Sequence, residues 1–312
     1  MIKNICIIST GKYLPEKIVL NDDLPKELNT NDEWIVQRTG IKQRHISNEN
    51  ENVVFMSARA VQECLEKAKI SAENINLIII ATTTPNKIFP SCATQVQSTI
   101  GAKNAFCFDI QSVCSGFLYL YYTAINMMHG DDKIQNAIII GAEQMSKILD
   151  WNDRSTCVLF GDGAGAVLLS KTENRNRGYI DGILKSDGNI CDILYANQND
   201  FLKMDGKKVF LHATSKLKDS ILEICSKNGV DMNSIKYFLI HQANARILKY
   251  LAESLNISQD KFLMTIDIHA NTSAASIPLL INNYEDKFSE GDLVLMAAIG
   301  AGMSWGAILL RW

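Results

Sequence analysis

A chain of 312 residues, 47% of them hydrophobic, can bury a large core, and this length suggests two domains or two halves of one. The formal net charge of −3 excludes an overall positive field that would draw the chain to nucleic acid or to an anionic membrane, so we expect neither partner. The eight cysteines contain no CxxC pair, and their spacing resembles neither a zinc site nor a disulfide framework, which favours free thiols, no bound metal and a cytoplasmic location.

The first half alternates apolar runs of strand length with helical patterns. It begins with a strand at residues 2–9 rather than a signal peptide, and no later apolar run approaches the ~18 residues of a membrane span. Residues 21–47 are polar and irregular, with Trp34 and Arg38 on one face if their segment is helical. The other predicted elements are helices at 53–69, at 92–100 and after residue 114, and strands at 76–81, 105–110, 137–143 and 164–170.

The chain is organised around residues 105–129, where a buried strand changes to a helical period at Cys114. The free N–H groups and the positive dipole end of a starting helix favour an anion. We therefore expect the Cys114 thiol to ionise below the pKa of ~8.5 of a free cysteine and to act as a nucleophile. The alternative is that Cys114 is a small core residue, since free cysteine is commonly buried.

The second half repeats the first in outline. Its predicted elements are a strand pair at 178–188, a helix at 213–228, strand-to-helix passages at 237–255 and 262–284, and a closing segment at 293–312. GAGMSWGAILL near the end echoes GDGAGAVLLS of the first half, and GDGAG is not a dinucleotide loop because it leads into a strand. The pattern indicates an internal duplication with halves 1–173 and 174–312, joined in the polar run 171–177.

Three residues of chemical interest stand at comparable strand ends: Cys114, His241 and Asn271. Alone, His241 could be a structural histidine and Asn271 a helix N-cap, and His269 competes with His241 because it lies close to Asn271. Cysteine, histidine and asparagine occur in this order in papain-like proteases, but the CGSCW-type context of those enzymes is missing.

Six ordered motifs spread over nearly the whole chain resemble the beta-ketoacyl-acyl-carrier-protein synthase III family, the condensing enzymes that start bacterial type II fatty acid synthesis. They are NDEWIVQRTGI (31–41), CSGFLY (114–119), DWNDRSTCVLFGDGAGAV (150–167), HQANARI (241–247), NTSAASIP (271–278) and GAGMSWGA (300–307). The resemblance implies the α/β thiolase fold, with two duplicated βα halves in five αβαβα layers, and a homodimer.

The resemblance also implies an acyltransferase that needs no metal or redox cofactor. Cys114 would take the acetyl group of acetyl-CoA as a thioester, and malonyl-acyl carrier protein would lose CO2 and attack it, giving acetoacetyl-acyl carrier protein. His241 and Asn271 would donate hydrogen bonds to the malonyl thioester oxygen, which suits an amide that cannot act as a base. The backbone N–H groups of Cys114 and Ala301 would hold the acyl oxyanion.

By the same resemblance, Trp34 would stack on the adenine of CoA, and Arg38 and Arg154 would contact the nucleotide or its phosphates, a task for which the planar guanidinium is suited. Phe89 would reach across the dimer and close the partner's acyl pocket. The residues that would line the pantetheine tunnel are Gly206, Phe210 and Asn244.

Arg246 and Lys249 would help to dock the acidic carrier protein. Leu211 stands where the family usually has a basic residue and Lys207 where it has a polar amide, so docking is expected to rely on Lys207, Lys208 and Lys249. Two further departures from the family pattern, each an alanine near the site, are Ala270 and Ala301.

Three alternatives to this function are considered. The same fold could take a branched starter or serve secondary metabolism. A cysteine hydrolase would release free acid from an acyl-CoA without a malonyl substrate. A non-catalytic homologue is disfavoured, since such a chain has no chemical reason to keep Cys114, His241 and Asn271 together.

Overall fold

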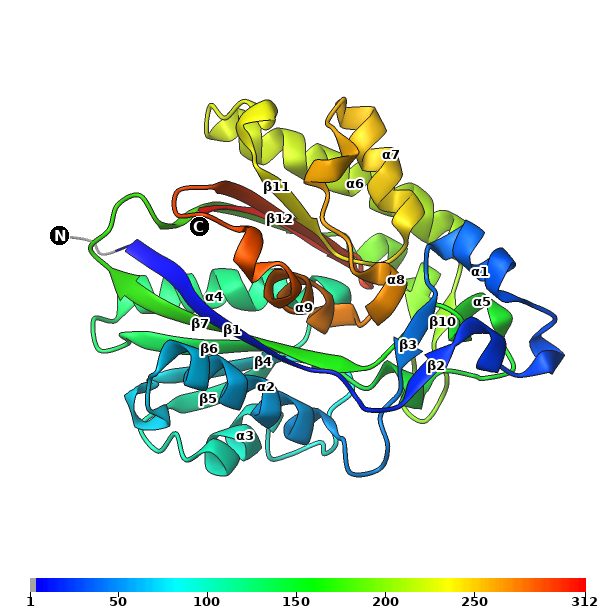
Figure 1. Ribbon diagram of the computed structural model, residues 1–312, viewed down its shortest axis with the longest axis horizontal. Helices are drawn as coiled ribbons and strands as arrows, with labels where there is room; N and C mark the ends of the chain where they lie inside the picture. The colour runs from blue at the N-terminus through cyan, green and yellow to red at the C-terminus, as the bar shows by residue number, and fades with distance from the viewer. Residues whose placement is uncertain (1–3) are drawn as a thin grey trace.

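Two large sheets with helices between and around them form the body of the computed structural model, which describes residues 4–312 (Figure 1). Residues 2 and 3 of the first predicted strand lie outside this range. The first sheet runs in the order β1 (Asn4–Tyr13), β7 (Gly163–Thr172), β6 (Asn136–Glu143), β4 (Leu77–Ala81) and β5 (Phe106–Ile110). The second sheet runs in the order β11 (Tyr237–Ile240), β12 (Leu293–Gly300), β13 (Ser304–Arg311) and β8 (Gly178–Ser186).

The helices form three layers that alternate with the two sheets (Figure 1). The outer face of the first sheet is covered by α2 (Val53–Ala68) and α3 (Cys92–Ile100), and that of the second by α6 (Gly206–Lys227) and α7 (Ala245–Leu255). Between the sheets lie α4 (Gly116–Gly130) and α9 (Ser276–Asn283). These five αβαβα layers are the predicted thiolase-like fold.

The two halves repeat each other strand by strand. The pairs β1/β7 and β7/β6 are antiparallel and β6/β4 is parallel; likewise β8/β13 and β13/β12 are antiparallel and β12/β11 is parallel. The first sheet uses residues 4–172 and the second residues 178–311, while the boundary between residues 173 and 174 stays a prediction. By this correspondence α9 occupies in the second half the place that α4 has in the first.

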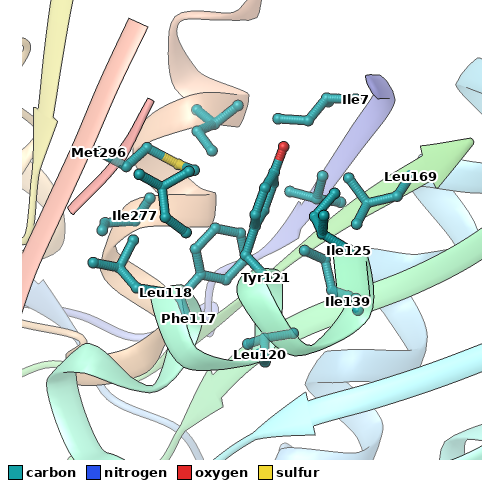
Figure 2. Close-up of a cluster of buried hydrophobic side chains, with 14 of the residues drawn as sticks. Ile7, Phe117, Leu118, Leu120, Tyr121, Ile125, Ile139, Leu169, Ile277 and Met296 are labelled. Atoms are coloured by element: carbon teal, nitrogen blue, oxygen red, sulfur yellow. The ribbon is translucent and has the colours of Figure 1, made fainter. Parts of the chain in front are cut away.

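The helix that follows Cys114 lies in the apolar centre of the molecule. Figure 2 shows Phe117, Leu118 and Tyr121 of α4 packed among side chains from both halves. Each sheet supplies this layer with one face of its strands because side chains alternate along a strand: Leu77 and Ile79 of β4 point inward, whereas Ile78 and Ile80 pack against α2 and α3. The site-bearing end of α4 is therefore fixed by the largest buried cluster of the fold.

Short elements build the rim on which the site opens. They are β2 (Ile18–Leu20), α1 (Asp32–Thr39), β3 (Gln43–His45), α5 (Arg154–Cys157), β9 (Leu194–Tyr195), β10 (Lys203–Met204) and α8 (Ile266–His269). The segment predicted to be irregular thus contains a helix, which places Trp34 and Arg38 on one face. Within residues 4–312 the structure contains no helix with the length and apolar character of a bilayer span.

Three predicted elements differ from the structure. Residues 178–186 form one strand rather than two. Gly182 makes no turn but allows close packing, since a Cβ at this position would lie 2.8 Å from the Tyr122 ring. Helix α6 begins at Gly206 rather than at residue 213, with Asp205 as N-cap accepting from the Lys208 N–H at 3.1 Å. The strand predicted after residue 262 is a single parallel bridge, Phe238↔Phe262.

Candidate active site

Cys114 lies in the 3₁₀ turn η4 (Val113–Ser115), between the end of β5 and the start of α4. Val113 has φ +46°, a conformation that a β-branched residue rarely adopts. Hydroxyls hold the strained turn in place: Ser112 donates to Ser304 at 2.9 Å, and the hydroxyls of Ser115 and Ser304 are 2.7 Å apart. The predicted position of Cys114 at a strand-to-helix junction is confirmed.

The end of β12 closes on this turn. A Cβ at Gly300 would lie 2.8 Å from the backbone nitrogen of Cys114 and 2.9 Å from that of Ser115, so only glycine allows this approach. Ala301 follows Gly300 directly and lines a cavity that also reaches Cys114.

Burial dominates the ionisation of the nucleophile. It raises the pKa of the Cys114 thiol to about 12, and within this net value the Glu143 carboxylate adds to the rise while the Ser273 side chain opposes it. The prediction of a lowered pKa is wrong for this thiol. The physical reason is the size of the two opposing effects. A helix dipole stabilises an anion by about 0.3–1 kcal/mol, which is under one pKa unit and less than the free-energy cost of burying a thiolate. Its proton therefore needs an acceptor during attack.

His241 follows β11, and its ring is fixed by a residue that the sequence did not single out. Its Nδ1 lies 2.7 Å from the hydroxyl oxygen of Ser276, which also accepts the Gln242 N–H at 3.1 Å. Within residues 4–312 the structure gives the Ser276 hydroxyl no other acceptor, so we assign its proton to the bond with Nδ1 and the ring proton of His241 to Nε2. Burial lowers the pKa of His241 to about 3, so the ring is neutral and offers an N–H.

Asn271 is oriented by its own turn. Its Oδ1 accepts the Ser273 N–H at 2.9 Å, which leaves the amide NH2 as the group free to donate. The residue before it, Ala270, has φ +56° and ψ −160°, a conformation that glycine adopts easily and other residues rarely. Asn271 is not the N-cap of α9, since the structure places Ala275 in that position.

A cavity of about 260 Å³ brings Cys114, His241 and Asn271 to one place, at the ends of elements from both halves. His269, the competing histidine, does not line it. The cavity is also lined by the other residues predicted for CoA, pantetheine and part of the docking surface, which are Trp34, Arg38, Arg154, Gly206, Phe210, Asn244 and Arg246.

The outer part of this cavity is aromatic and positively charged. The guanidinium carbons of Arg38 and Arg154 lie 4.3 and 4.8 Å from the centre of the Trp34 ring. Arg154 also donates to the carbonyl of Asn29 at 2.7 Å. Asn244 caps α7 through the Arg246 N–H at 2.9 Å while lining the cavity. This grouping places a flat aromatic ring and two cations together at one end of the cavity.

The remaining predicted residues lie elsewhere. Ala301 lines a second cavity of about 1220 Å³ that also reaches Cys114. Phe89 lines neither cavity of its own chain and is 83% exposed, beside Ile88 at 93%. Lys249 lies on the surface of α7 and lines neither cavity.

Three partners of the site were not singled out as site residues from the sequence, although Ser273 and Ser276 lie within the motif at 271–278. Ser276 holds His241, Ser273 holds Asn271, and Glu143 accepts a hydrogen bond from the Ser273 hydroxyl at 3.2 Å. Within residues 4–312 the structure has no group of three or more histidine, cysteine, aspartate or glutamate side chains that could bind a metal ion.

The fold and the cavity together define the class of protein: a thiolase-like condensing acyltransferase. Two family models match the chain, 3-oxoacyl-[acyl-carrier-protein] synthase III at residues 108–188 and the C-terminal part of the same family at residues 225–312. The beta-ketoacyl-[acyl-carrier-protein] synthase III of Ehrlichia chaffeensis is 48% identical over 99% of each chain, and that of Wolbachia pipientis wMel is 48% identical over 98% of each.

The solved structure of 3-oxoacyl-[acyl-carrier-protein] synthase III from Aquifex aeolicus superposes with a TM-score of 0.95 at 42% identity, over 99% of this chain and 100% of the other. The chain belongs to the beta-ketoacyl-acyl-carrier-protein synthase III family.

Proposed function

We propose that the protein condenses acetyl-CoA with malonyl-acyl carrier protein, releasing CO2 and CoA and giving acetoacetyl-acyl carrier protein, the first condensation of fatty acid synthesis. The observation that carries the proposal is the meeting of a cysteine nucleophile with two N–H donors in one cavity whose outer part suits a nucleotide.

In the first half-reaction the Cys114 sulfur attacks the acetyl carbonyl carbon. The oxyanion that forms accepts hydrogen bonds from the backbone N–H groups of Cys114 and Ala301, which belong to the two chain segments in contact at Gly300. The bond to the CoA sulfur then breaks, CoA leaves, and an acetyl thioester remains on Cys114.

In the second half-reaction malonyl-acyl carrier protein loses CO2, and negative charge develops on its thioester oxygen. His241 and Asn271 stabilise this oxygen through Nε2–H and Nδ2–H, because each residue has its other polar atom already engaged. The carbanion attacks the acetyl carbon and releases the Cys114 sulfur. Losing one such donor typically costs about 10²–10³ in rate.

The outer cavity serves the two carriers in turn. Trp34 stacks on the adenine of CoA, and Arg38 and Arg154 contact the nucleotide or its phosphates. Carrier-protein docking is assigned to Arg246 and Lys249, aided by the exposed lysines at the start of α6, Lys207 and Lys208. The pantetheine arm would run along Gly206, Phe210 and Asn244.

The active form is proposed to be a cytoplasmic homodimer that needs no membrane, metal or redox cofactor. The exposed Phe89 supports a pairing in which it closes the partner's acyl pocket. All eight cysteines are free, as a reducing compartment would keep them. Sedimentation of the purified chain tests the dimer: a species of 34.7 kDa alone, with no larger one at working concentration, contradicts it.

The reaction is tested by incubating the protein with acetyl-CoA and malonyl-acyl carrier protein and measuring acetoacetyl-acyl carrier protein by mass and free CoA by a thiol reagent. Equal amounts of the two products support the proposal. Free acetate without malonyl-acyl carrier protein would indicate a hydrolase, and a product formed only from longer or branched acyl-CoA would replace the donor.

A further inference from the structure

Glu143 is a fully buried carboxylate that has no part in the two proposed half-reactions. It ends β6, and within residues 4–312 no lysine, arginine or histidine forms an ion pair with it. Its oxygens accept hydrogen bonds from neutral donors, the Thr83 N–H at 3.0 Å and four hydroxyls at 2.6 to 3.3 Å, which belong to Thr82, Thr83, Thr84 and Ser273. Burying a carboxylate without a cation costs free energy, and these hydrogen bonds offset part of that cost.

The donors to this carboxylate come from both halves of the chain. The threonines follow β4 of the first sheet, whereas Ser273 begins the 3₁₀ turn η9 (Ser273–Ala275), which leads into α9 of the second half. Glycine lets the two segments touch, since a Cβ at Gly141, two residues before Glu143, would lie 2.1 Å from the Ala274 carbonyl oxygen. The hydrogen bond between Glu143 and Ser273 therefore joins the end of β6 to the start of η9 at a close contact of the two halves.

Ser273 has a backbone conformation that needs support from its surroundings. Its φ is +49°, in the left-handed region that residues other than glycine rarely adopt. Such a conformation persists where surrounding contacts hold the residue. The side chain of Ser273 is buried, and its hydroxyl donates to Glu143 Oε1 at 3.2 Å. The carboxylate thus supplies a contact that holds Ser273 at this φ.

The backbone of the same serine orients the amide of Asn271. The Ser273 N–H donates to Asn271 Oδ1 at 2.9 Å. Because φ is the rotation about the N–Cα bond, it relates the direction of this N–H to the side chain that Glu143 holds. The backbone of Asn271 is fixed separately, through the Leu159 carbonyl at 3.0 Å and the Gly161 N–H at 3.1 Å. Within residues 4–312 the Ser273 N–H is the hydrogen-bonding partner that the structure gives to the Asn271 side chain.

We propose that Glu143 is a positioning residue for the condensation, which through Ser273 holds Asn271 with its amide NH2 towards the malonyl thioester. The inference rests on the proposed role of Asn271 as a hydrogen-bond donor in the second half-reaction. Glu143 lines neither cavity, so it acts through Ser273 and does not touch the substrate.

Loss of the carboxylate should act on the direction of the Asn271 amide. Without Glu143, Ser273 is free to leave φ +49°, and its N–H no longer fixes Asn271 Oδ1. The amide can then turn over and present its oxygen, which donates no hydrogen bond, to the thioester oxygen on which charge develops. The first half-reaction does not use this amide, so the two half-reactions should respond differently.

The test breaks the link at either end and measures the two half-reactions separately. Ser273→Ala removes the hydroxyl and keeps the N–H, and Glu143→Ala removes the acceptor. Intact mass follows acetylation of Cys114 by acetyl-CoA, and CO2 release follows decarboxylation of malonyl-acyl carrier protein. We expect both variants to slow CO2 release about 10- to 100-fold, up to the lower end of the 10²–10³-fold loss of a whole donor, while acetylation slows by about threefold at most.

A matched control and a double variant separate positioning from a general loss of structure. Thr83→Val removes a hydroxyl that donates to the same carboxylate at 3.1 Å and leaves the bond between Glu143 and Ser273 in place, so both rates should stay within about threefold of wild type. In an Asn271→Ala background the donor is already gone. Adding Ser273→Ala to that background should therefore slow CO2 release by no more than about a further threefold.

Two results would overturn the proposal. One is that Ser273→Ala and Glu143→Ala slow acetylation as much as CO2 release, and the other is that Ser273→Ala adds its full effect to that of Asn271→Ala. If Glu143→Ala does not fold, Ser273→Ala and its double variant decide alone.

Failure of the proposed function is recognised separately. If the wild-type chain releases no CO2 from malonyl-acyl carrier protein, the proposed function is wrong, and hydrogen exchange of the Ser273 N–H in 15N-serine-labelled protein then tests the link. Faster exchange in Glu143→Ala than in Thr83→Val supports the link from Glu143 to Ser273, and equal exchange in the two variants overturns it.

Discussion

Ser276→Ala should separate the two half-reactions. In the wild-type chain the Ser276 hydroxyl donates to His241 Nδ1 at 2.7 Å and thereby keeps the ring proton on Nε2. Alanine removes this donor, so the proton can move to Nδ1, where the ring no longer offers an N–H to the malonyl thioester. Acetylation of Cys114 should be unchanged, because His241 is a donor in this account and not the base.

The size of the effect follows from the contacts that are lost. A hydrogen bond is worth about 0.5–1.5 kcal/mol net, and 1.36 kcal/mol is tenfold in rate, so the condensation should slow about two- to thirteenfold. Complete loss of the His241 donor, at about 10²–10³-fold, sets the upper limit. The buried Gln242 N–H, which donates to Ser276 at 3.1 Å, loses its acceptor, and the free energy of unfolding should fall by about 1–3 kcal/mol.

Each half-reaction has its own assay. Rapid quenching and intact mass measure acetylation of Cys114 by acetyl-CoA, and CO2 release measures decarboxylation of malonyl-acyl carrier protein on the acetylated protein. Ser276→Thr keeps the hydroxyl donor but changes the volume of the side chain, so it is the control for a change of volume at this position. If Ser276→Ala slows acetylation as much as condensation, His241 serves Cys114 as a base and the assignment of its proton to Nε2 is refuted.

Three further predictions concern the turn, the nucleotide site and the pH dependence of stability. Gly300→Ala places a Cβ 2.8 Å from the Cys114 nitrogen, and displacement of that turn should slow acetylation about 10²-fold, measured by intact mass; a rate near wild type would mean that the close approach is unnecessary. Trp34→Ala should raise KM for acetyl-CoA about tenfold with little change for acetyl-pantetheine, which lacks the adenine, whereas equal effects on both would remove the stacking role. Burial lowers the pKa of His269 from 6.5 to about 3, so between these values the unfolded chain binds a proton that the folded chain does not, and stability falls as pH drops. The free energy of unfolding, measured with urea, should fall from pH 7.5 to pH 5.5 by about 1.4 kcal/mol less in His269→Gln than in wild type. An identical fall in both would contradict the lowered pKa of His269.

The nucleophile and its elements could be predicted because their signals are local. The change from a short apolar run to a period of three to four residues marks the junction at Cys114, and the structure has β5, the turn and α4 there. Asp205 before Gly206 was an N-cap signal that could have moved the start of α6 to the observed position.

The errors lie where distant packing decides. A glycine is typical of a turn, but Gly182 lies within β8. Glycine is needed there because the Tyr122 ring occupies the space that a side chain would fill. Phe262 begins a strand-like run, yet it forms only one bridge with Phe238 where the first half has the full strand β5. Glu143 could not be predicted as a neighbour of the site because its hydrogen-bonding partners stand 59 to 61 and 130 residues away in the sequence.

The most direct measurement is the intact mass of the purified protein after incubation with acetyl-CoA alone, beside Cys114→Ala. The account predicts the gain of a single acetyl group, absent from the variant, that is discharged when malonyl-acyl carrier protein is added. If no acyl-CoA labels Cys114, the thioester mechanism is contradicted.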